Sequence, residues 1–192
     1  MFLRYWKVFA FTISCVFLFN FSFAQTKEKD KKLFDISIEN QLYPAGDIIY
    51  IRTMRPINER SGLMLKLGYN FARRQNFGKH DKENGGGPGF ALGYRYYLKK
   101  ELAGFFLAAR AGLWVMKIDW EDTRANVIES GKTNITVLQP AAAAGYQYVT
   151  QSSQWAFEAG AAFGVEWNIA TKGEEVGQGG ISLFFVGVSR RF

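Results

Sequence analysis

Large apolar side chains alternate with small or polar ones along much of the chain, most clearly over residues 155–170. The odd positions of this segment, from Trp155 to Ile169, are all apolar, whereas its even positions are small or polar and include Glu158 and Glu166. This period of two predicts a β-strand with one apolar and one polar face. A helix would scatter the aromatic side chains around its circumference and place both glutamates in apolar surroundings.

The same alternation recurs in segments rich in Leu, Phe and Tyr. Together with the turn signals between them, these segments predict eight strands, over residues 34–42, 47–55, 61–74, 88–98, 102–120, 132–149, 154–170 and 179–192. Beyond Val115 the pattern inverts, because Lys117 and Asp119 fall on the apolar side. This inversion indicates either a β-bulge or the point where the strand leaves a membrane.

The predicted connections alternate in length: residues 56–60, 99–101 and 150–153 are short, whereas 75–87, 121–131 and 171–178 are longer, charged and glycine-rich. Short periplasmic turns and longer outer loops are typical of outer-membrane barrels. The first hairpin, at residues 43–46, is an exception because it is short at the loop side. Trp155 and Trp167 lie on one face of a tilted strand and are separated by roughly 30 Å along the membrane normal, which suits two aromatic girdles. The predicted fold is therefore all-β: an eight-stranded antiparallel transmembrane up-and-down β-barrel.

The first 24 residues have the organisation of a signal peptide. Arg4 and Lys7 precede the apolar stretch 8–19, and small residues at positions 22 and 24 form a cleavage site before Gln25. Residues 25–33 are too polar to pack and are predicted to be a periplasmic lead-in to a barrel over residues 34–192. The only cysteine, Cys15, lies within the apolar stretch, where lipoprotein processing is the alternative interpretation. Cleavage after residue 24 would leave a mature chain without a disulfide.

The charge balance is only mildly basic. Of the 24 Lys and Arg residues, Arg4 and Lys7 belong to the signal peptide, so 22 remain against 17 Asp and Glu, a net charge of +5. An excess of this size fits either solvated loops or attraction to an anionic surface, and no nucleic-acid partner is predicted.

Charged side chains occupy the polar faces of the predicted strands, which must point inward if the apolar faces meet lipid. The interior of an eight-stranded barrel is just wide enough to be filled by side chains, and buried charges persist only when they are paired. We therefore expect an ion-pair network that plugs the lumen, with a charged pore lining as the alternative. Its predicted members are Asp35, Glu39, Arg52, Lys66, Arg95, Arg110, Glu158 and Glu166.

Catalytic and metal-binding motifs are weak. His80 is the only histidine, it lies in a charged loop, and no nucleophile motif surrounds it, so a solvated histidine is expected rather than a Ser-His-acid triad. No metal site and no cofactor are predicted. Residues 131–133 imitate the end of a phosphate-binding loop, but Asn126 stands where that motif needs glycine.

Another loop holds four basic residues that are candidate contacts for lipopolysaccharide phosphates, or alternatively ordinary solvated side chains: Arg73, Arg74, Lys79 and Lys82.

The last strand carries Phe184, Val186, Val188 and the terminal Phe192 on alternate positions. This pattern resembles the assembly signal of outer-membrane β-barrel proteins, although Arg190 stands where the signal usually has an apolar residue. The whole mature chain resembles the small barrels typified by OmpA and OmpX, and the run Gly93–Tyr97 is similar to barrels of Bacteroidetes-type bacteria. The resemblance implies a monomer in the outer membrane of a Gram-negative bacterium. It also implies insertion by the barrel assembly machinery and contact with outer-membrane lipid, including lipopolysaccharide.

Several functions remain open at this point. The leading hypothesis is a structural or surface-interaction role without catalysis. The alternatives are a narrow pore or transporter for small or apolar solutes and, third, an enzyme that modifies membrane lipids. A soluble lipocalin-like binder would need a polar outside and an apolar inside, whereas the charges here share a face with the smaller side chains.

Overall fold

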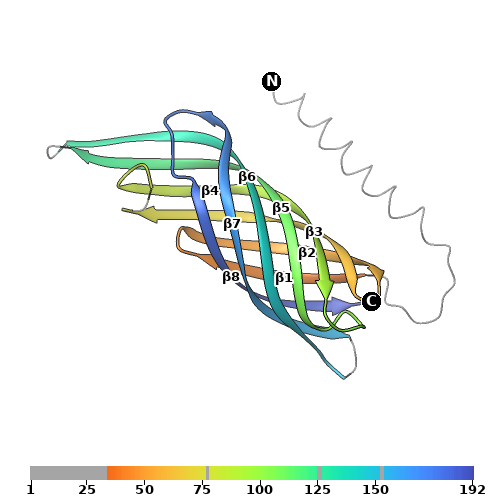
Figure 1. The fold of residues 1–192 in the computed structure, drawn as a ribbon. Coiled ribbons are helices and arrows are strands. Elements are labelled where there is room, and N and C mark those ends of the chain that lie inside the picture. Colours follow the sequence, from red (N-terminus) through yellow and green to blue (C-terminus); the bar gives the residue numbers. More distant parts are fainter. Residues whose placement is uncertain (1–33, 77, 125–126, 152–153) are drawn as a thin grey trace. The chain divides into compact units, whose positions relative to one another are not determined.

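The computed structural model describes residues 34–76, 78–124, 127–151 and 154–192. In these ranges the chain forms eight strands: β1 (Asp35–Tyr43), β2 (Gly46–Asn58), β3 (Ser61–Gln75), β4 (Lys82–Tyr97), β5 (Gly104–Arg124), β6 (Val127–Val149), β7 (Trp155–Lys172) and β8 (Gly179–Arg191). Each strand pairs antiparallel with its neighbours in the sequence, and β8 pairs with β1, so the sheet closes into a barrel (Figure 1). The predicted eight-stranded barrel is confirmed. The predicted signal peptide and lead-in, residues 1–33, lie outside the described residues.

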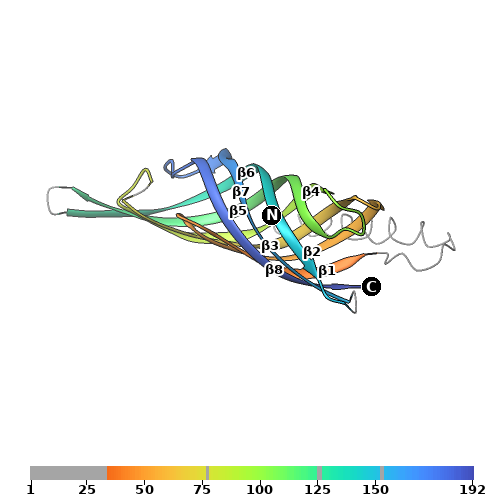
Figure 2. The same ribbon diagram turned by 60° about the horizontal axis from the view of Figure 1, so that its bottom comes forward.

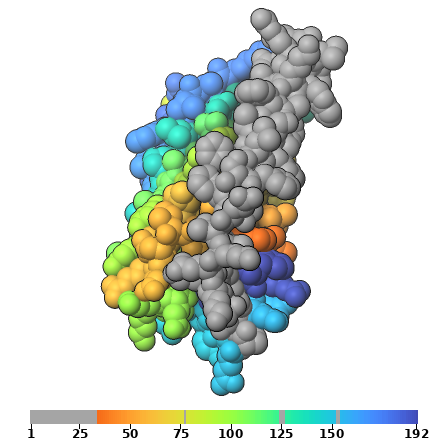
Figure 3. All heavy atoms as spheres, turned by 90° about the vertical axis from the view of Figure 1, so that its right-hand side faces the viewer, coloured from red at the N-terminus to blue at the C-terminus, as the bar shows by residue number. Residues whose placement is uncertain are grey.

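The two ends of the barrel differ in their connections. The short turns β2–β3, β4–β5 and β6–β7 lie at the end where β8 finishes, which we call the turn end; Figure 3 views the molecule from this side. The other four connections lie at the opposite end, the loop end, and the β5–β6 hairpin protrudes farthest there (Figures 1 and 2). Pairing between β6 and β7 begins only at Asn134 and Lys172, so the tip of this hairpin projects beyond the closed barrel.

The predicted strand bounds differ from the structure mainly at the loop end. There β4 begins at Lys82 instead of residue 88, and β5 and β6 continue to Arg124 and Val127. Gly85, Gly86 and Gly87, expected to lie in the loop, are part of β4; all three pair with β3, and Gly85 and Gly86 also pair with β5. Gly89 shows why glycine is needed within this strand, because an added Cβ would overlap the ring of inward-pointing Trp114. Gly89 therefore allows close packing inside the barrel, and the glycines before it do not mark a turn.

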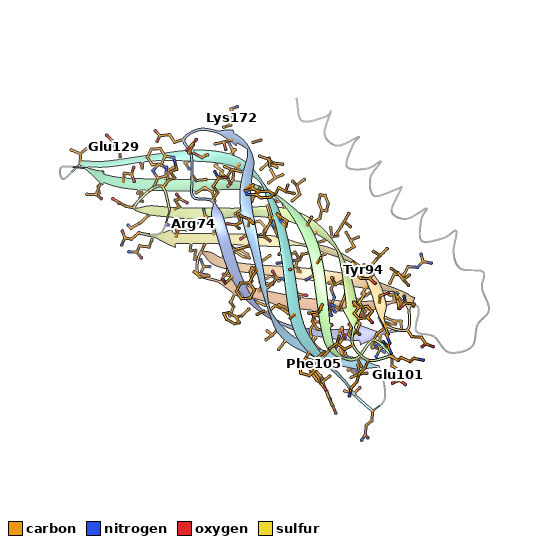
Figure 4. All side chains as sticks on the ribbon, in the orientation of Figure 1. Arg74, Tyr94, Glu101, Phe105, Glu129 and Lys172 are labelled. Carbon is orange, nitrogen blue, oxygen red and sulfur yellow. The ribbon has the colours of Figure 1, made fainter. Side chains whose placement is uncertain are left out.

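The outer surface of the barrel is strongly apolar. Phe105, Phe163 and Phe184 each keep more than 60% of their surface exposed, and most strands contribute similar residues. Tyr94 and Phe105 are labelled near the turn end in Figure 4. An apolar surface of this extent is typical of contact with lipid, because soluble monomers rarely expose patches beyond a few hundred Å². No helix within the described ranges is long and apolar enough to cross a membrane.

The inversion beyond Val115 is explained by a change in surroundings and not by a bulge. Pairing of β4 with β5 keeps one register, with Gly89 opposite Trp114 and Gly86 opposite Lys117. Side chains therefore continue to alternate, and Lys117 remains on the outward face as Val115 does. Since only the chemistry of the outward face changes, this position indicates where the apolar belt ends.

Candidate functional site

The lumen contains a network of buried charges centred on Glu158 of β7. Arg95 of β4 donates from Nη1 to Glu158 Oε2 at 2.6 Å, and Arg52 of β2 donates to the other carboxylate oxygen. All three side chains are at least 98% buried. The two guanidinium groups come from strands that are not neighbours of β7, so these ion pairs cross the lumen.

A second carboxylate extends the network toward β1 and β3. Lys66 donates to both oxygens of Glu39, at 2.6 and 2.8 Å, and Arg52 lies 3.4 Å from the same carboxylate. Asp35 lies 3.8 Å from Arg52. Cations from β2, β3 and β4 therefore alternate with carboxylates from β1 and β7, and six of the eight predicted lumen residues are brought together.

Arg110 lies beside this network but contacts neutral groups. Its guanidinium donates to the Tyr50 hydroxyl at 3.0 Å and to Gln41 Oε1 at 2.7 Å. Gln41 in turn donates to Glu39, so Arg110 is linked to the ion pairs through an amide. As a member of the predicted ion-pair network, Arg110 is expected to bond an acidic side chain. In the structure its partners are Tyr50 and Gln41 instead.

Glu166, the eighth predicted lumen residue, belongs to a separate cluster nearer the loop end. Arg74 donates to Glu83 at 2.9 Å and to Glu166 at 3.0 Å, and Gln139 donates to Glu166 at 3.1 Å. The prediction that Arg74 contacts lipopolysaccharide is therefore wrong, because the side chain is buried inside the barrel (Arg74 is labelled in Figure 4). The alternation of β3 explains the correction: consecutive residues point to opposite faces, so Arg73 is exposed and Arg74 is not.

Apolar side chains fill much of the remaining lumen. Trp114, Ile48 and Leu183 are completely buried and belong to a cluster that extends toward the loop end. A second cluster around Phe106 and Met54 lies toward the turn end, where the Arg95 guanidinium lies 3.9 Å from the centre of the Phe106 ring. The sequence interpretation missed these residues, although the even positions of β5 from Phe106 to Trp120 carry the signal.

The connections at the loop end form a compact structure that we call the outer cap: residues 76 and 78–81 between β3 and β4, and residues 173–178 between β7 and β8. Glu83 is completely buried beneath it and accepts hydrogen bonds from the backbone N–H groups of Lys79, at 2.9 Å, and Gly177, at 3.0 Å. Since the same carboxylate bonds Arg74, one side chain connects both parts of the cap to the barrel interior.

His80 is part of the outer cap, and the expectation that it is solvated is wrong. Its ring stacks on Trp120 with centroids 4.3 Å apart, and only 8% of the residue is exposed. Nδ1 lies 3.1 Å from Asp122 Oδ2 and Nε2 lies 3.0 Å from the Glu175 carbonyl oxygen. The sequence could not show this, because Trp120, Asp122 and Glu175 are distant in the chain.

Two of the remaining candidate lipopolysaccharide contacts have acidic partners at the surface. Lys79 donates to Glu175 at 2.7 Å, which raises the pKa of the lysine, and Lys82 donates to Glu121 at 3.1 Å. Lys82 also borders a surface hollow of about 340 Å³ whose lining includes Asp119 and Glu121, so its charge is mixed. The fourth predicted residue, Arg73, is exposed on the outward face of β3.

The side chains of the terminal strand lie as the alternation predicts. Phe184, Val186 and Phe192 are exposed on the outer surface, and Val188 is partly exposed there. Arg190 shares this face and lies over the rings of Trp155 and Phe192, at 5.7 and 5.5 Å from their centres. A guanidinium that packs on two aromatic rings covers apolar surface, which explains how arginine is accommodated at this position.

The described side chains include no group of three or more His, Cys, Asp or Glu residues placed to hold a metal ion. No protein-family model and no curated protein matches the sequence.

Solved structures match the fold. The chain is similar to a major outer membrane protein from Thermus thermophilus, with a TM-score of 0.50 and 14% identity over 83% of this chain and 99% of that one. It also matches the N-terminal β-barrel domain of Pseudomonas aeruginosa OprF, with a TM-score of 0.45 and 17% identity over 83% of this chain and 96% of that one. A third match is Neisserial surface protein A, with a TM-score of 0.46 and 12% identity over 83% of this chain and 94% of that one. The chain thus has the fold of eight-stranded outer-membrane barrels.

Proposed function

We propose that this chain is an outer-membrane barrel with a structural or surface-interaction role and a lumen that is plugged by its own side chains. The observation that carries the proposal is the combination of an apolar outer belt with ion pairs that cross the lumen from Arg52 and Arg95 to Glu158. The belt supports a position within a lipid bilayer. The crossing ion pairs support a closed interior, because they stand where a pore would need water.

Packing within the lumen supports closure further. Trp114, Arg52, Arg95, Tyr50 and Tyr97 are the largest completely buried side chains, and all of them point inward. A cavity of about 10 Å³ near Asp35 and Arg191, at the turn end, has room for about one water molecule. These contacts favour a plug over the narrow pore or transporter that remains the alternative function.

A conductance measurement distinguishes the plugged barrel from the narrow pore or transporter. The refolded mature chain in a planar bilayer should show no steady current, and Glu158→Ala should produce openings because it removes the carboxylate that joins two guanidinium groups. Glu121→Ala, at an exposed ion pair outside the lumen, is the matched control and should stay silent. Steady wild-type currents that scale with salt concentration would favour the transport function.

A non-catalytic role is part of the proposal. The single histidine of the sequence has both ring nitrogens occupied by Asp122 and the Glu175 carbonyl, so its position suits structure better than proton transfer to a substrate.

We also propose that the barrel binds the phosphates of lipopolysaccharide, through a different group of cations from the one that the sequence predicted. Lys117 and Lys172 lie on the outward face on either side of Asn134, with which both are paired in register. Exposed Lys132 is the next outward residue of β6, and Lys172 is labelled at the loop end in Figure 4. Cations at the edge of the apolar belt nearer the loop end are well placed to meet phosphates at a lipid surface.

The test compares unfolding of the barrel in vesicles of phosphatidylcholine alone, with phosphatidylglycerol, and with lipopolysaccharide. Lipopolysaccharide should stabilise the wild type, and the double variant Lys117→Gln, Lys172→Gln should lose most of that gain. Lys79→Gln with Lys82→Gln is the matched control, because those lysines already contact acidic side chains. Equal loss in both double variants, or equal stabilisation by phosphatidylglycerol, would contradict specific binding of lipopolysaccharide at this patch.

A further inference from the structure

The outer cap contains a histidine whose two ring nitrogens both face hydrogen-bond acceptors. Nδ1 of His80 lies 3.1 Å from a carboxylate oxygen of Asp122, and Nε2 lies 3.0 Å from the backbone carbonyl oxygen of Glu175. A neutral imidazole carries one N–H and can donate to only one of these acceptors. The charged ring carries two N–H groups and can donate to both, so the observed geometry suits the protonated form.

We propose that His80, Asp122 and Glu175 form a pH-dependent latch that holds the outer cap closed when the ring is protonated and releases one side of it when the ring is neutral. The three residues belong to three separate segments: the β3–β4 connection, β5 and the β7–β8 connection. Loss of one N–H therefore removes the contact that His80 makes with one of the other two segments, although Glu83 and the Lys79–Glu175 ion pair still join the two connections. Histidine is the side chain whose unperturbed charge change falls between about pH 5 and 8, so it suits a device of this kind.

Carboxylates outnumber cations among the described groups that face His80 or contact its neighbours. Glu83 accepts from the His80 backbone N–H at 3.4 Å. Asp81 holds the same connection to β5, because its N–H donates to Asp122 at 3.0 Å and its carboxylate accepts from the Thr123 N–H at 2.7 Å. Among the described residues these charged groups are Asp122 on β5, Glu83 on β4, Arg74 on β3, Glu175 on the β7–β8 connection, and Lys79 and Asp81 beside His80.

Stacking restricts the ring to this position. The imidazole and Trp120 planes are only 11° from parallel, so the ring cannot turn toward new partners without losing the stacking contact. Release of the latch should therefore move a loop and leave the ring in place. Because the Glu83 carboxylate still bonds Gly177 and Arg74, the β7–β8 connection should loosen around Glu175 without leaving the barrel.

The direction in which pH changes closure of the cap follows from which state of the cap binds the protonated ring. The closed cap binds the charged ring through two acceptors, whereas the released cap does not. Closure is therefore complete at low pH and is lost as pH rises through the range in which the ring deprotonates. The latch would give the loop end of the barrel a conformational response to pH. This response does not depend on whether the lumen conducts.

Nuclear magnetic resonance of the tag-free barrel in nanodiscs tests the latch directly, because the chain has a single histidine and its ring signals need no assignment. At pH 5 both ring nitrogens should be protonated. Between pH 5 and 8, hydrogen exchange across residues 174–176 of the β7–β8 connection should accelerate roughly tenfold beyond the intrinsic pH effect, the loss expected for one charge-assisted hydrogen bond.

His80→Gln is the matched variant, since its amide does not titrate; it should exchange at a rate that shows no additional pH dependence. Asp122→Asn keeps an acceptor but removes its charge, so the wild-type transition should move to lower pH. A wild-type ring that is neutral at pH 5 overturns the latch, as does an equal pH response in wild type and His80→Gln. The ring measurement needs no variant, so it remains decisive if either substitution prevents folding.

Discussion

Glu158→Gln removes one negative charge from the lumen while it preserves side-chain volume. In the wild type this carboxylate contacts the guanidinium groups of Arg52 and Arg95. Arg52 would retain Glu39, at 3.4 Å, whereas Arg95 would keep neutral contacts, with the Tyr97 hydroxyl at 3.3 Å and the Phe106 ring at 3.9 Å. Removing one partner of a buried ion pair costs about 3–5 kcal/mol, and the partial compensation of Arg52 places the expected loss near the lower limit, about 3 kcal/mol.

Urea unfolding in lipid vesicles, followed by tryptophan fluorescence and by migration in SDS gels without heating, measures this loss. Glu121→Gln is the matched control, because Glu121 and Lys82 are each about half exposed, at 52%, and their ion pair should contribute roughly 0–1 kcal/mol. The reasoning is refuted if the two variants lose the same free energy of unfolding, since Glu158 would then be solvated as it would be in an open pore.

Two further substitutions and one deletion address separate parts of the barrel. Arg110→Met should cost roughly 1–3 kcal/mol in the same unfolding assay, less than the Glu158 variant, because it leaves two neutral acceptors without a donor. Gly89→Ala should lower stability by roughly 1–3 kcal/mol because its Cβ overlaps an inward tryptophan, whereas Gly180→Ala, which meets nothing within 4 Å, should not. Deletion of Phe192 should reduce the fraction of barrel that inserts in cells, measured by heat-dependent gel migration, whereas Phe163→Ala on the same lipid-facing surface should insert normally.

Much of the barrel could be predicted from the alternation alone. A period of two separates inward from outward positions, so the sequence alone assigns Glu39, Lys66 and Glu158 to the lumen. The pairs that they form could not be predicted, because each depends on the register of strands that are far apart in the sequence. Arg110 illustrates the limit: its inward direction follows from the pattern, but its neutral partners do not.

The sequence predicts the loop end less well, because the polar ends of the strands resemble solvated loops. Charged and glycine-rich residues were interpreted as solvated loops, yet the strands continue beyond the apolar belt with water on their outer face. There the outward residues become polar while Met116 and Ile118 remain buried inside. Arg74 and His80 were assigned to the solvent for the same reason, although three-dimensional packing against Glu83 and Trp120 buries both.

The central claim is that aromatic residues on the outer surface meet lipid while the lumen is filled and closed to it. The tryptophans of the chain test this directly, because Trp155 and Trp167 are 43% and 50% exposed on the outer face, whereas Trp114 is completely buried in the lumen. Variants that retain one of these three, with every other tryptophan replaced by phenylalanine, would be refolded into vesicles of lipids brominated near the headgroup end of the acyl chain. The account predicts strong quenching of Trp155 and Trp167 fluorescence and little quenching of Trp114; equal quenching of all three, or quenching of Trp114 alone, would contradict it.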